Sequence, residues 1–189
     1  MVINGLIGTL GYRNRGDIED SLNSTQILIE MVELEKTFEI FMTNGAEKVG
    51  TIIELAVDCS NQFNQQYLLQ VLMAICKQLK QSNDSSNVFR DLDDEGQDGA
   101  NENKKNQQFD PSLPQNKNVL NFLDQVEKQN MFSNLILNIN QRDDEVTYTN
   151  QNQINVKKLG QRRLKSLEVI HAVLQLLYPS NGKLARSML

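Results

Sequence analysis

Apolar side chains recur at intervals of three and four residues through most of this chain, and no useful length alternates in the two-residue pattern of a half-buried strand. This spacing places the apolar side chains of each segment on one face of a helix. The stripes predicted to face a core are Leu22, Ile27, Leu28, Met31 and Val32; Phe38, Phe41 and Met42; Val49, Ile52, Ile53, Ala56 and Val57; Leu68, Val71, Leu72, Ile75 and Leu79; Val119, Leu120, Leu123 and Val126; Met131, Phe132, Leu135, Ile136 and Ile139; and Leu164, Leu167, Ile170, Val173, Leu174 and Leu177. The sequence therefore predicts an all-α fold.

The helices are short, their connecting turns are short, and their apolar faces are broad. These properties are typical of stacked helical pairs, so we expect a HEAT/armadillo-like helical repeat, that is, an α-solenoid. No repeat recurs at a fixed period, which argues against regular tetratricopeptide or ankyrin arrays. A compact helical bundle remains the alternative.

The chain divides into three segments by composition. Residues 1–80 form an N-terminal helical segment, and residues 119–189 form a C-terminal one. Between them, residues 81–118 are rich in Asn and Asp and sparse in apolar side chains, so they cannot offset their ordering entropy by burial. We expect this middle segment to be a disordered acidic linker. The last residues begin an amphipathic pattern that stops, so we also expect the chain to be a fragment, truncated at its end.

Within the C-terminal segment, a helix break is expected near Gln129 and Asn130, and a second polar loop over residues 140–155. The strongest helix of the chain is expected to begin near Gly160. It is expected to close over residues 178–182, where Pro179 and Gly182 occupy stop positions.

Composition argues against several functions. The chain of 189 residues has a net charge of -5 and a pI near 5.0, whereas a general binder of nucleic acid or of anionic membranes would be basic. No apolar run is long enough to span a membrane. Cys59 and Cys76 both lie in apolar helical patterns, which favours reduced, buried thiols in a cytoplasmic protein. We expect a cytoplasmic protein, with the nucleus as an additional location, and neither a membrane nor a nucleic-acid partner.

One acidic stretch matches a calcium-binding loop by spacing. The matching positions 1, 3, 5, 6 and 12 of an EF-hand loop are Asp91, Asp93, Glu95, Gly96 and Glu102. Neither flank has an amphipathic helical pattern, and position 8 is acidic where paired loops place an apolar residue. A solvated acidic linker is therefore the favoured interpretation, and we expect no metal or other cofactor.

Catalytic residues are not expected either. His171 is the one histidine, and it lies a turn beyond Leu167 in a helical pattern. General-base chemistry would require a nucleophile or carboxylate held beside it, and no nucleophile motif is present. We interpret His171 as a packed or edge residue and the protein as a non-enzyme.

Basic residues crowd the expected start of the strongest helix. They are Lys157, Lys158, Arg162, Arg163 and Lys165. Cations at a helix N-terminus oppose its dipole, at about 0.3–1 kcal/mol each, so their concentration in an acidic protein needs a reason. We take Lys158, Arg162, Arg163 and Lys165 as candidate contacts with an acidic partner surface. Pairing with Asp143, Asp144 and Glu145, or simple solvation, is the alternative. An RNA contact is less favoured because no aromatic residues interleave with the cluster.

Residues 159–174 also resemble part of a known family, the SAPS domain of the regulatory subunits of the protein phosphatase 6 class. That family carries a Leu-Gly-x-x-Arg-Leu/Phe element that opens a helix with an aliphatic continuation. The matching residues are Leu159, Gly160, Arg163 and Leu164 in the element, and Ile170, Val173 and Leu174 in the continuation. Lys158 departs from the pattern, because the family often has proline there.

The resemblance implies a helical, HEAT/armadillo-like scaffold without catalytic residues. Its partner would be a serine/threonine phosphatase catalytic subunit, whose activity the scaffold modulates or targets. Gly160 would then permit a tight turn or close packing, and Arg163 could bind a carboxylate within the scaffold or on the phosphatase. A generic helical-repeat scaffold that binds another protein or RNA is the alternative.

Overall fold

The computed structural model describes residues 5–8, 18–43, 46–58, 65–92, 114–140 and 152–180. At several helix ends, including residues 83–92 and 152–159, it describes the backbone only. After a single helical turn at residues 5–8, the helices are α2 (Ile18–Glu33), α3 (Glu35–Thr43), α4 (Ala46–Val57), α5 (Gln65–Leu92), α6 (Pro114–Lys128), α7 (Met131–Asn140) and α8 (Asn152–Ser180). No strand occurs in these ranges, so the predicted all-α class is confirmed. None of the described helices is long and apolar enough to cross a membrane.

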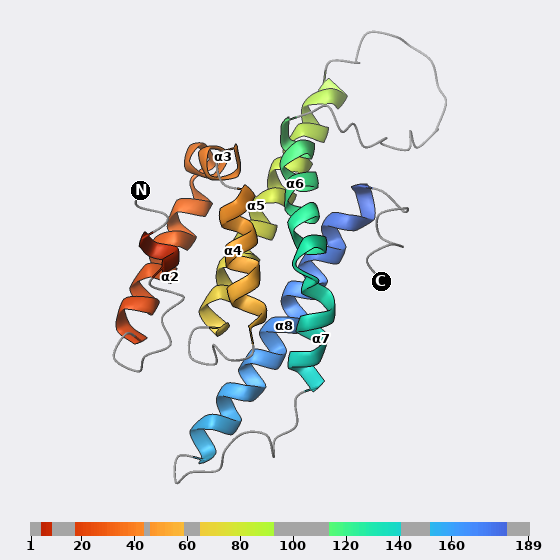
Figure 1. The fold of residues 1–189 in the computed structure, drawn as a ribbon. Coiled ribbons are helices and arrows are strands. Elements are labelled where there is room, and N and C mark those ends of the chain that lie inside the picture. Colours follow the sequence, from red (N-terminus) through yellow and green to blue (C-terminus); the bar gives the residue numbers. More distant parts are fainter. Residues whose placement is uncertain are drawn as a thin grey trace.

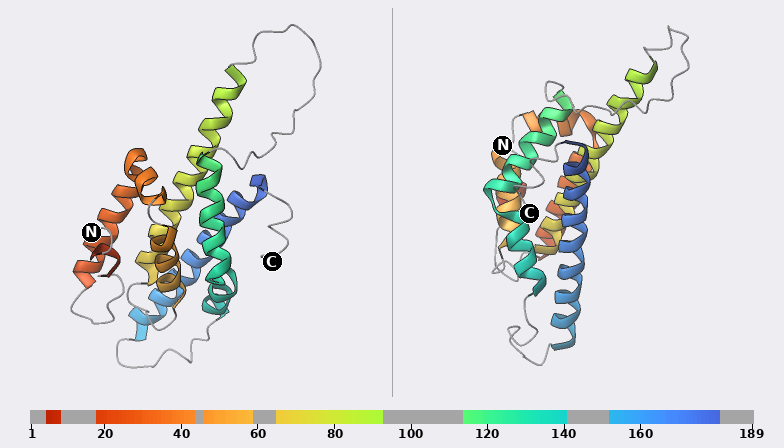
Figure 2. Two further views of the ribbon diagram at one scale, coloured as in Figure 1. Left: turned by 45° about the horizontal axis from the view of Figure 1, so that its top comes forward. Right: turned by 90° about the vertical axis from the view of Figure 1, so that its right-hand side faces the viewer.

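The long helices form two layers (Figure 1). α5 lies at the centre of one layer, with α2 packed on one side and α8 on the other. α4, α6 and α7 form the second layer, which covers the inner side of α5 and α8 (Figure 2). The helices of the first layer run in the same direction, and those of the second layer run in the opposite direction. Consecutive helices such as α4 and α5 are therefore antiparallel, whereas neighbours within a layer are parallel.

One continuous core lies between the layers and joins both halves of the chain. Its fully buried members include Ile52 and Ile53 of α4, Leu72 of α5, and Leu123 of α6. The stripes predicted for α4 and α5 face the core and are buried, apart from Val57, which is partly buried. Burial of these apolar side chains supplies the main stabilising free energy of the fold, at about 25 cal/mol per Å² of apolar surface removed from water.

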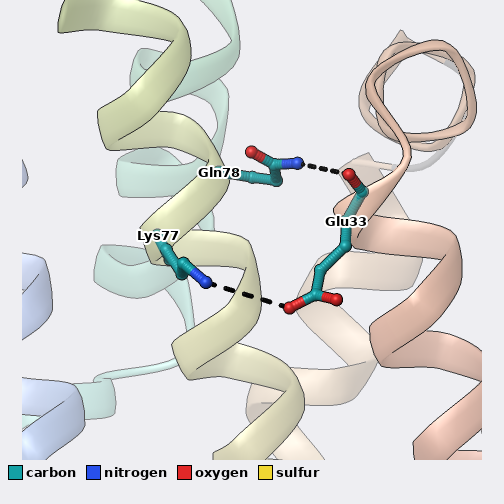
Figure 3. A network of polar contacts seen from close by, with 3 residues as sticks. All are labelled: Glu33, Lys77 and Gln78. Atoms are coloured by element: carbon teal, nitrogen blue, oxygen red, sulfur yellow. Dashed lines mark hydrogen bonds and ion pairs between the residues drawn. The ribbon is translucent and has the colours of Figure 1, made fainter.

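A polar junction closes the end of α2 against α5 (Figure 3). The last helical residue, Glu33, has a backbone carbonyl that accepts a hydrogen bond of 2.8 Å from Nε2 of Gln78. Its carboxylate lies 3.9 Å from Nζ of Lys77. Because the last carbonyls of a helix have no partner within it, Gln78 supplies a cap that fixes α2 beside α5.

The predicted break near Gln129 and Asn130 is confirmed as the turn between α6 and α7. Asn130 has a φ of 47°, the left-handed region that asparagine tolerates better than most residues. Its carbonyl accepts a hydrogen bond from the backbone N–H of Asn134, and the Asn134 side chain donates to the carbonyl of Gln129 at 3.2 Å. The turn lets α7 continue in the direction of α6 while changing the face it presents.

The predicted linker boundaries are wrong at both ends. α5 continues to Leu92, twelve residues into the segment 81–118 by count from Gln81, and α6 already begins at Pro114. Proline is favoured in the first turn of a helix because its missing N–H would have no partner there. Residues 93–113 lie outside the described residues, as does most of the calcium-like loop that begins at Asp91.

Several predicted core positions are exposed instead. Leu22 and Ile27 of α2 lie at the surface, as does Ile136 of α7. In α8, Leu164 and Leu167 are 55% and 51% exposed. The core-facing side chains of α8 are Arg162, Ser166, Val169, Val173, Leu176 and Leu177. The apolar residues of α8 therefore lie on more than one face, and the predicted stripe mixed buried positions with exposed ones.

Candidate functional site

The best-defined polar cluster lies where the end of α4 meets α5, α7 and α8. Gln65, the first residue of α5, donates from Nε2 to the carbonyl of Ala56 at 2.9 Å. Asn138 of α7 donates from Nδ2 to the carbonyl of Val57 at 3.4 Å. Arg162 of α8 donates from Nη1 to Oε1 of Gln65 at 3.3 Å. Three other helices thus satisfy the last carbonyls of α4, directly or through Gln65.

This cluster is a structural joint rather than a surface site. Gln65, Asn138 and Arg162 are all buried, and Arg162 is only 7% exposed. The positive guanidinium lies near the C-terminal end of α4, where the helix dipole is negative, which compensates part of its burial. Sequence reasoning placed Arg162 among the partner contacts. The structure corrects this assignment, because Arg162 is used inside the fold.

The structure also corrects two other expectations about this region. α8 begins at Asn152, so Arg162, Arg163 and Lys165 lie well inside the helix, and a dipole cost limited to the first turn does not apply to them. Gly160 is exposed, has no positive φ, and a Cβ built on it would meet nothing within 4 Å. It therefore serves neither a tight turn nor close packing with the described residues.

One flank of α8 combines a cation with apolar side chains. Arg163, Leu167, Ile170 and Leu174 follow the i, i+4, i+7, i+11 spacing of a single helix side. Ile170 and Leu174 are packed against the core, Arg163 is partly exposed, and Leu167 is half exposed. We call these four residues the α8 flank. The flank presents surface that a partner protein could cover.

The other basic candidates differ in their surroundings. Lys165 forms an ion pair with Glu168, 2.7 Å from Nζ to Oε2. The alternative acidic partners, Asp143, Asp144 and Glu145, lie outside the described residues. Lys158 and Leu159 are helical, but their side chains are not among those described. Leu164 projects away from the core. Of the four partner-contact candidates, Arg163 and Lys165 are the ones described at the surface.

The outer side of α8 faces α5 across a groove. Its wider part has a volume of about 450 Å³, and its lining includes Met73, Ala74 and Lys80 of α5 and His171 and Gln175 of α8. Lys80 donates from Nζ to Oε1 of Gln175 at 3.0 Å, and Nε2 of Gln175 lies 2.7 Å from Nε2 of His171. The Gln175 amide can donate to this ring nitrogen in the His171 tautomer that carries its hydrogen on Nδ1. His171 is thus an edge residue on an exposed helix, as its sequence context predicted.

Cys76 lies beneath this groove as a buried, free thiol. Burial raises its pKa from 9.0 to about 12, partly opposed by a backbone hydrogen bond. A thiol in this state is a poor nucleophile, because the thiolate is the reactive form. Cys59, the other predicted buried thiol, lies outside the described residues. No group of three or more His, Cys, Asp or Glu side chains within the described part of the chain is placed to hold a metal ion.

Sequence reasoning missed the residues that build the joint and the groove. Asn138 follows the apolar stripe of α7, a pattern that signals a buried hydrogen-bonding role, whereas Gln65 stands in a polar run before the stripe of α5 and carries no such signal. The groove depends on α5 and α8 being neighbours, which residue spacing does not reveal. Comparison with known proteins adds no relative: no protein-family model, curated protein or solved structure matches the chain.

Proposed function

We propose that this chain is a non-catalytic regulatory subunit that binds a serine/threonine phosphatase catalytic subunit of the protein phosphatase 6 class and modulates or targets its activity. The partner class comes from the resemblance of residues 159–174 to the SAPS domain. The contact surface comes from the α8 flank, which lies within those same residues. The protein would act through binding alone, with the chemistry supplied by the phosphatase.

The observation that carries the proposal is the exposure of Leu167 beside Arg163. Leu167 is 51% exposed although it lies in a helix with an ample buried face. The α8 flank combines this exposed leucine with an arginine and further apolar side chains on the same side. The buried centres of protein–protein interfaces have a similar composition, since arginine is enriched there. Arg163 would pair with a carboxylate on the phosphatase in bidentate geometry.

The proposed architecture is a HEAT/armadillo-like solenoid. It is supported by the two antiparallel pairs α4–α5 and α7–α8, whose second helices lie side by side and run parallel (Figure 1). Stacked helical pairs of this kind expose long helix flanks at which partners bind. The alternative of a compact bundle would leave the same α8 flank exposed, so the binding proposal does not depend on the repeat.

The direct test is co-purification of the full chain with a purified phosphatase catalytic subunit of this class. We expect retention by the unmodified protein and at least about a tenfold loss of affinity for Leu167→Asp and for Arg163→Glu, since each removes an interface contact of about 1.4 kcal/mol or more. Leu34→Asp is the matched control, because Leu34 is 62% exposed at the corner between α2 and α3. Circular dichroism establishes that each variant is folded.

The outcomes separate the possibilities. Absence of binding by the unmodified protein contradicts the phosphatase proposal, as does binding that is equal in all variants. Retention of RNA that weakens steeply with salt, with no phosphatase binding, would instead favour a helical scaffold for RNA.

A further inference from the structure

A second exposed surface lies along the seam between α8 and α5, next to the α8 flank. The two helices run parallel, because moving from Gln65 to Lys80 along α5 moves the contact from Arg162 to Gln175 along α8. Two hollows follow each other along this seam. The first has a volume of about 350 Å³ and is lined by Gln66, Gln70, Gln161, Leu164 and Lys165. The second is the part of about 450 Å³ described above.

These two hollows lie in line along about four helical turns of the seam, and we treat them together as one groove. The α5 residues 66, 70, 73, 77 and 80 fall on a single helix face, and so do the α8 residues 161, 164, 168, 171 and 175. Fourteen steps between consecutive residues, at 1.5 Å each, give a length of about 21 Å. We call this feature the α5–α8 groove.

Small side chains explain why the groove is open. Ala74 and Ala172 line its wider part, and neither is long enough to fill the space between the two helices. Leu164 projects into the narrower part and is more than half exposed, although its side chain would be favoured in an apolar contact. Two parallel helices with a hollow seam offer the position that a third helix occupies in helix-in-groove recognition.

The charge of the groove favours a ligand of opposite charge. Its lining contains three lysines, Lys77, Lys80 and Lys165, and one acid, Glu168, which is paired with Lys165. Lys80 donates to the neutral amide of Gln175. Nζ of Lys77 lies 3.9 Å from the carboxylate of Glu33, and the side chains of Lys77 and Glu33 are both more than half exposed. The groove is thus locally cationic in a chain whose net charge is -5.

We propose that the α5–α8 groove binds an acidic amphipathic helix of about four turns, supplied by a partner protein. Apolar side chains of that helix would contact Leu164, Met73 and Ala172, and its carboxylates would face Lys77 and Lys80. The proposal is separate from phosphatase binding, because the charges that select this helix are Lys77 and Lys80 of α5, which do not belong to the α8 flank.

Fluorescence anisotropy with a defined probe tests this proposal on the full chain. The probe is a fluorescein-labelled, helix-forming peptide of fifteen residues with leucine at positions 4, 8 and 11 and glutamate and alanine elsewhere. A peptide with lysine in place of each glutamate is its counterpart. We expect the acidic peptide to bind, and the lysine peptide to bind at least about tenfold more weakly because of charge repulsion.

Variants of the groove decide where the probe binds. Lys77→Glu combined with Lys80→Glu should weaken the acidic peptide at least about tenfold, and Ala172→Trp should weaken it by filling the hollow. Lys117→Glu combined with Lys128→Glu makes the same charge change on exposed residues of α6 and should leave binding unchanged.

Three results would overturn the proposal: no binding of the acidic peptide, equal binding of the lysine peptide, or equal binding by the groove variants and the α6 control. Displacement of the peptide by a single-stranded RNA whose own binding needs Lys77 and Lys80 would assign the groove to nucleic acid instead, and would also overturn it.

Discussion

Arg162 and Gln65 form a buried hydrogen bond of 3.3 Å, from Nη1 to Oε1, that ties the middle of α8 to the first residue of α5. Gln65 passes the connection on by donating to the carbonyl of Ala56 at the end of α4. Two side chains thus link three helices. The contact lies at one end of the α5–α8 seam, beside Gln66 and Gln161, which line the groove.

Replacing Arg162 with methionine should destabilise the fold by about 1–3 kcal/mol. The change keeps an unbranched apolar stem but removes the guanidinium, which leaves the buried oxygen of Gln65 without this donor. Chemical denaturation measures the effect, and Lys165→Met is the control, expected to stay within about 0.5 kcal/mol because the Lys165 ion pair is partly exposed. Combining Arg162→Met with Gln65→Leu should cost less than the sum of the single changes. Additive effects would mean that the two side chains do not act together.

Gly160→Ala should stabilise the protein by about 0.5–1 kcal/mol. The residue lies inside α8 with open space around it, and alanine is the better helix former. Thermal unfolding provides the measurement. Gly50→Ala is the comparison, because its Cβ would lie 2.5 Å from Oε1 of Gln125 and that side chain would have to move, which reduces the gain. A loss of stability in Gly160→Ala would show that the glycine is required for packing or for a turn.

The stability of the protein should fall at alkaline pH through Cys76. Its pKa is about 12 in the folded protein and 9.0 ordinarily, so above pH 9 the unfolded chain loses a proton that the folded chain retains. The contribution is complete below pH 9 and is lost as the pH rises toward 12, with a slope of up to about 1.4 kcal/mol per pH unit.

Comparison of unfolding free energies at pH 8 and pH 10.5 isolates this slope. Cys76→Ala should show a smaller decrease than the unmodified protein, whatever its absolute stability. In a Cys59→Ala background, the remaining thiol should react with a disulfide reagent only at the rate of unfolding. Rapid reaction of the folded protein would contradict the buried placement of Cys76.

The cap on α2 should matter more than the ion pair beside it. Gln78→Ala removes the hydrogen bond to the Glu33 carbonyl and should cost about 1 kcal/mol. Glu33→Gln removes only the contact with Lys77, 3.9 Å away and more than half exposed on both sides, and should change stability by less than about 0.5 kcal/mol. Urea denaturation measures the loss of stability in each variant. A larger loss for Glu33→Gln than for Gln78→Ala would show that the ion pair, and not the cap, stabilises this junction.

The fold class and much of the core were predictable because several helices carry apolar residues on one face. In α5, Leu68, Leu72 and Ile75 were predicted to be buried, and they are. The prediction was less successful for α8, since Leu164 and Leu167 continue the apolar spacing but face away from the core, while Arg162 and Ser166 face it. Periodicity locates a stripe only when apolar residues avoid the other faces.

Helix ends were less predictable than helix faces. α5 continues to Leu92 through a polar sequence, because a helix can propagate beyond the residues that anchor it to the core. The joint and the groove could not be predicted, because both depend on which helices are neighbours. Gln65 and Arg162 are far apart in the sequence, and their contact follows from the parallel packing of α5 and α8.

Hydrogen–deuterium exchange of the full chain, alone and saturated with a phosphatase catalytic subunit of the protein phosphatase 6 class, tests whether this protein binds such a subunit through α8. We expect slower exchange on binding in peptides that cover residues 160–176, unchanged exchange in α3, and loss of this protection in Leu167→Asp. Saturation by the subunit without any change over residues 160–176, or a failure of the folded chain to bind it, would show that α8 is not a phosphatase-binding surface.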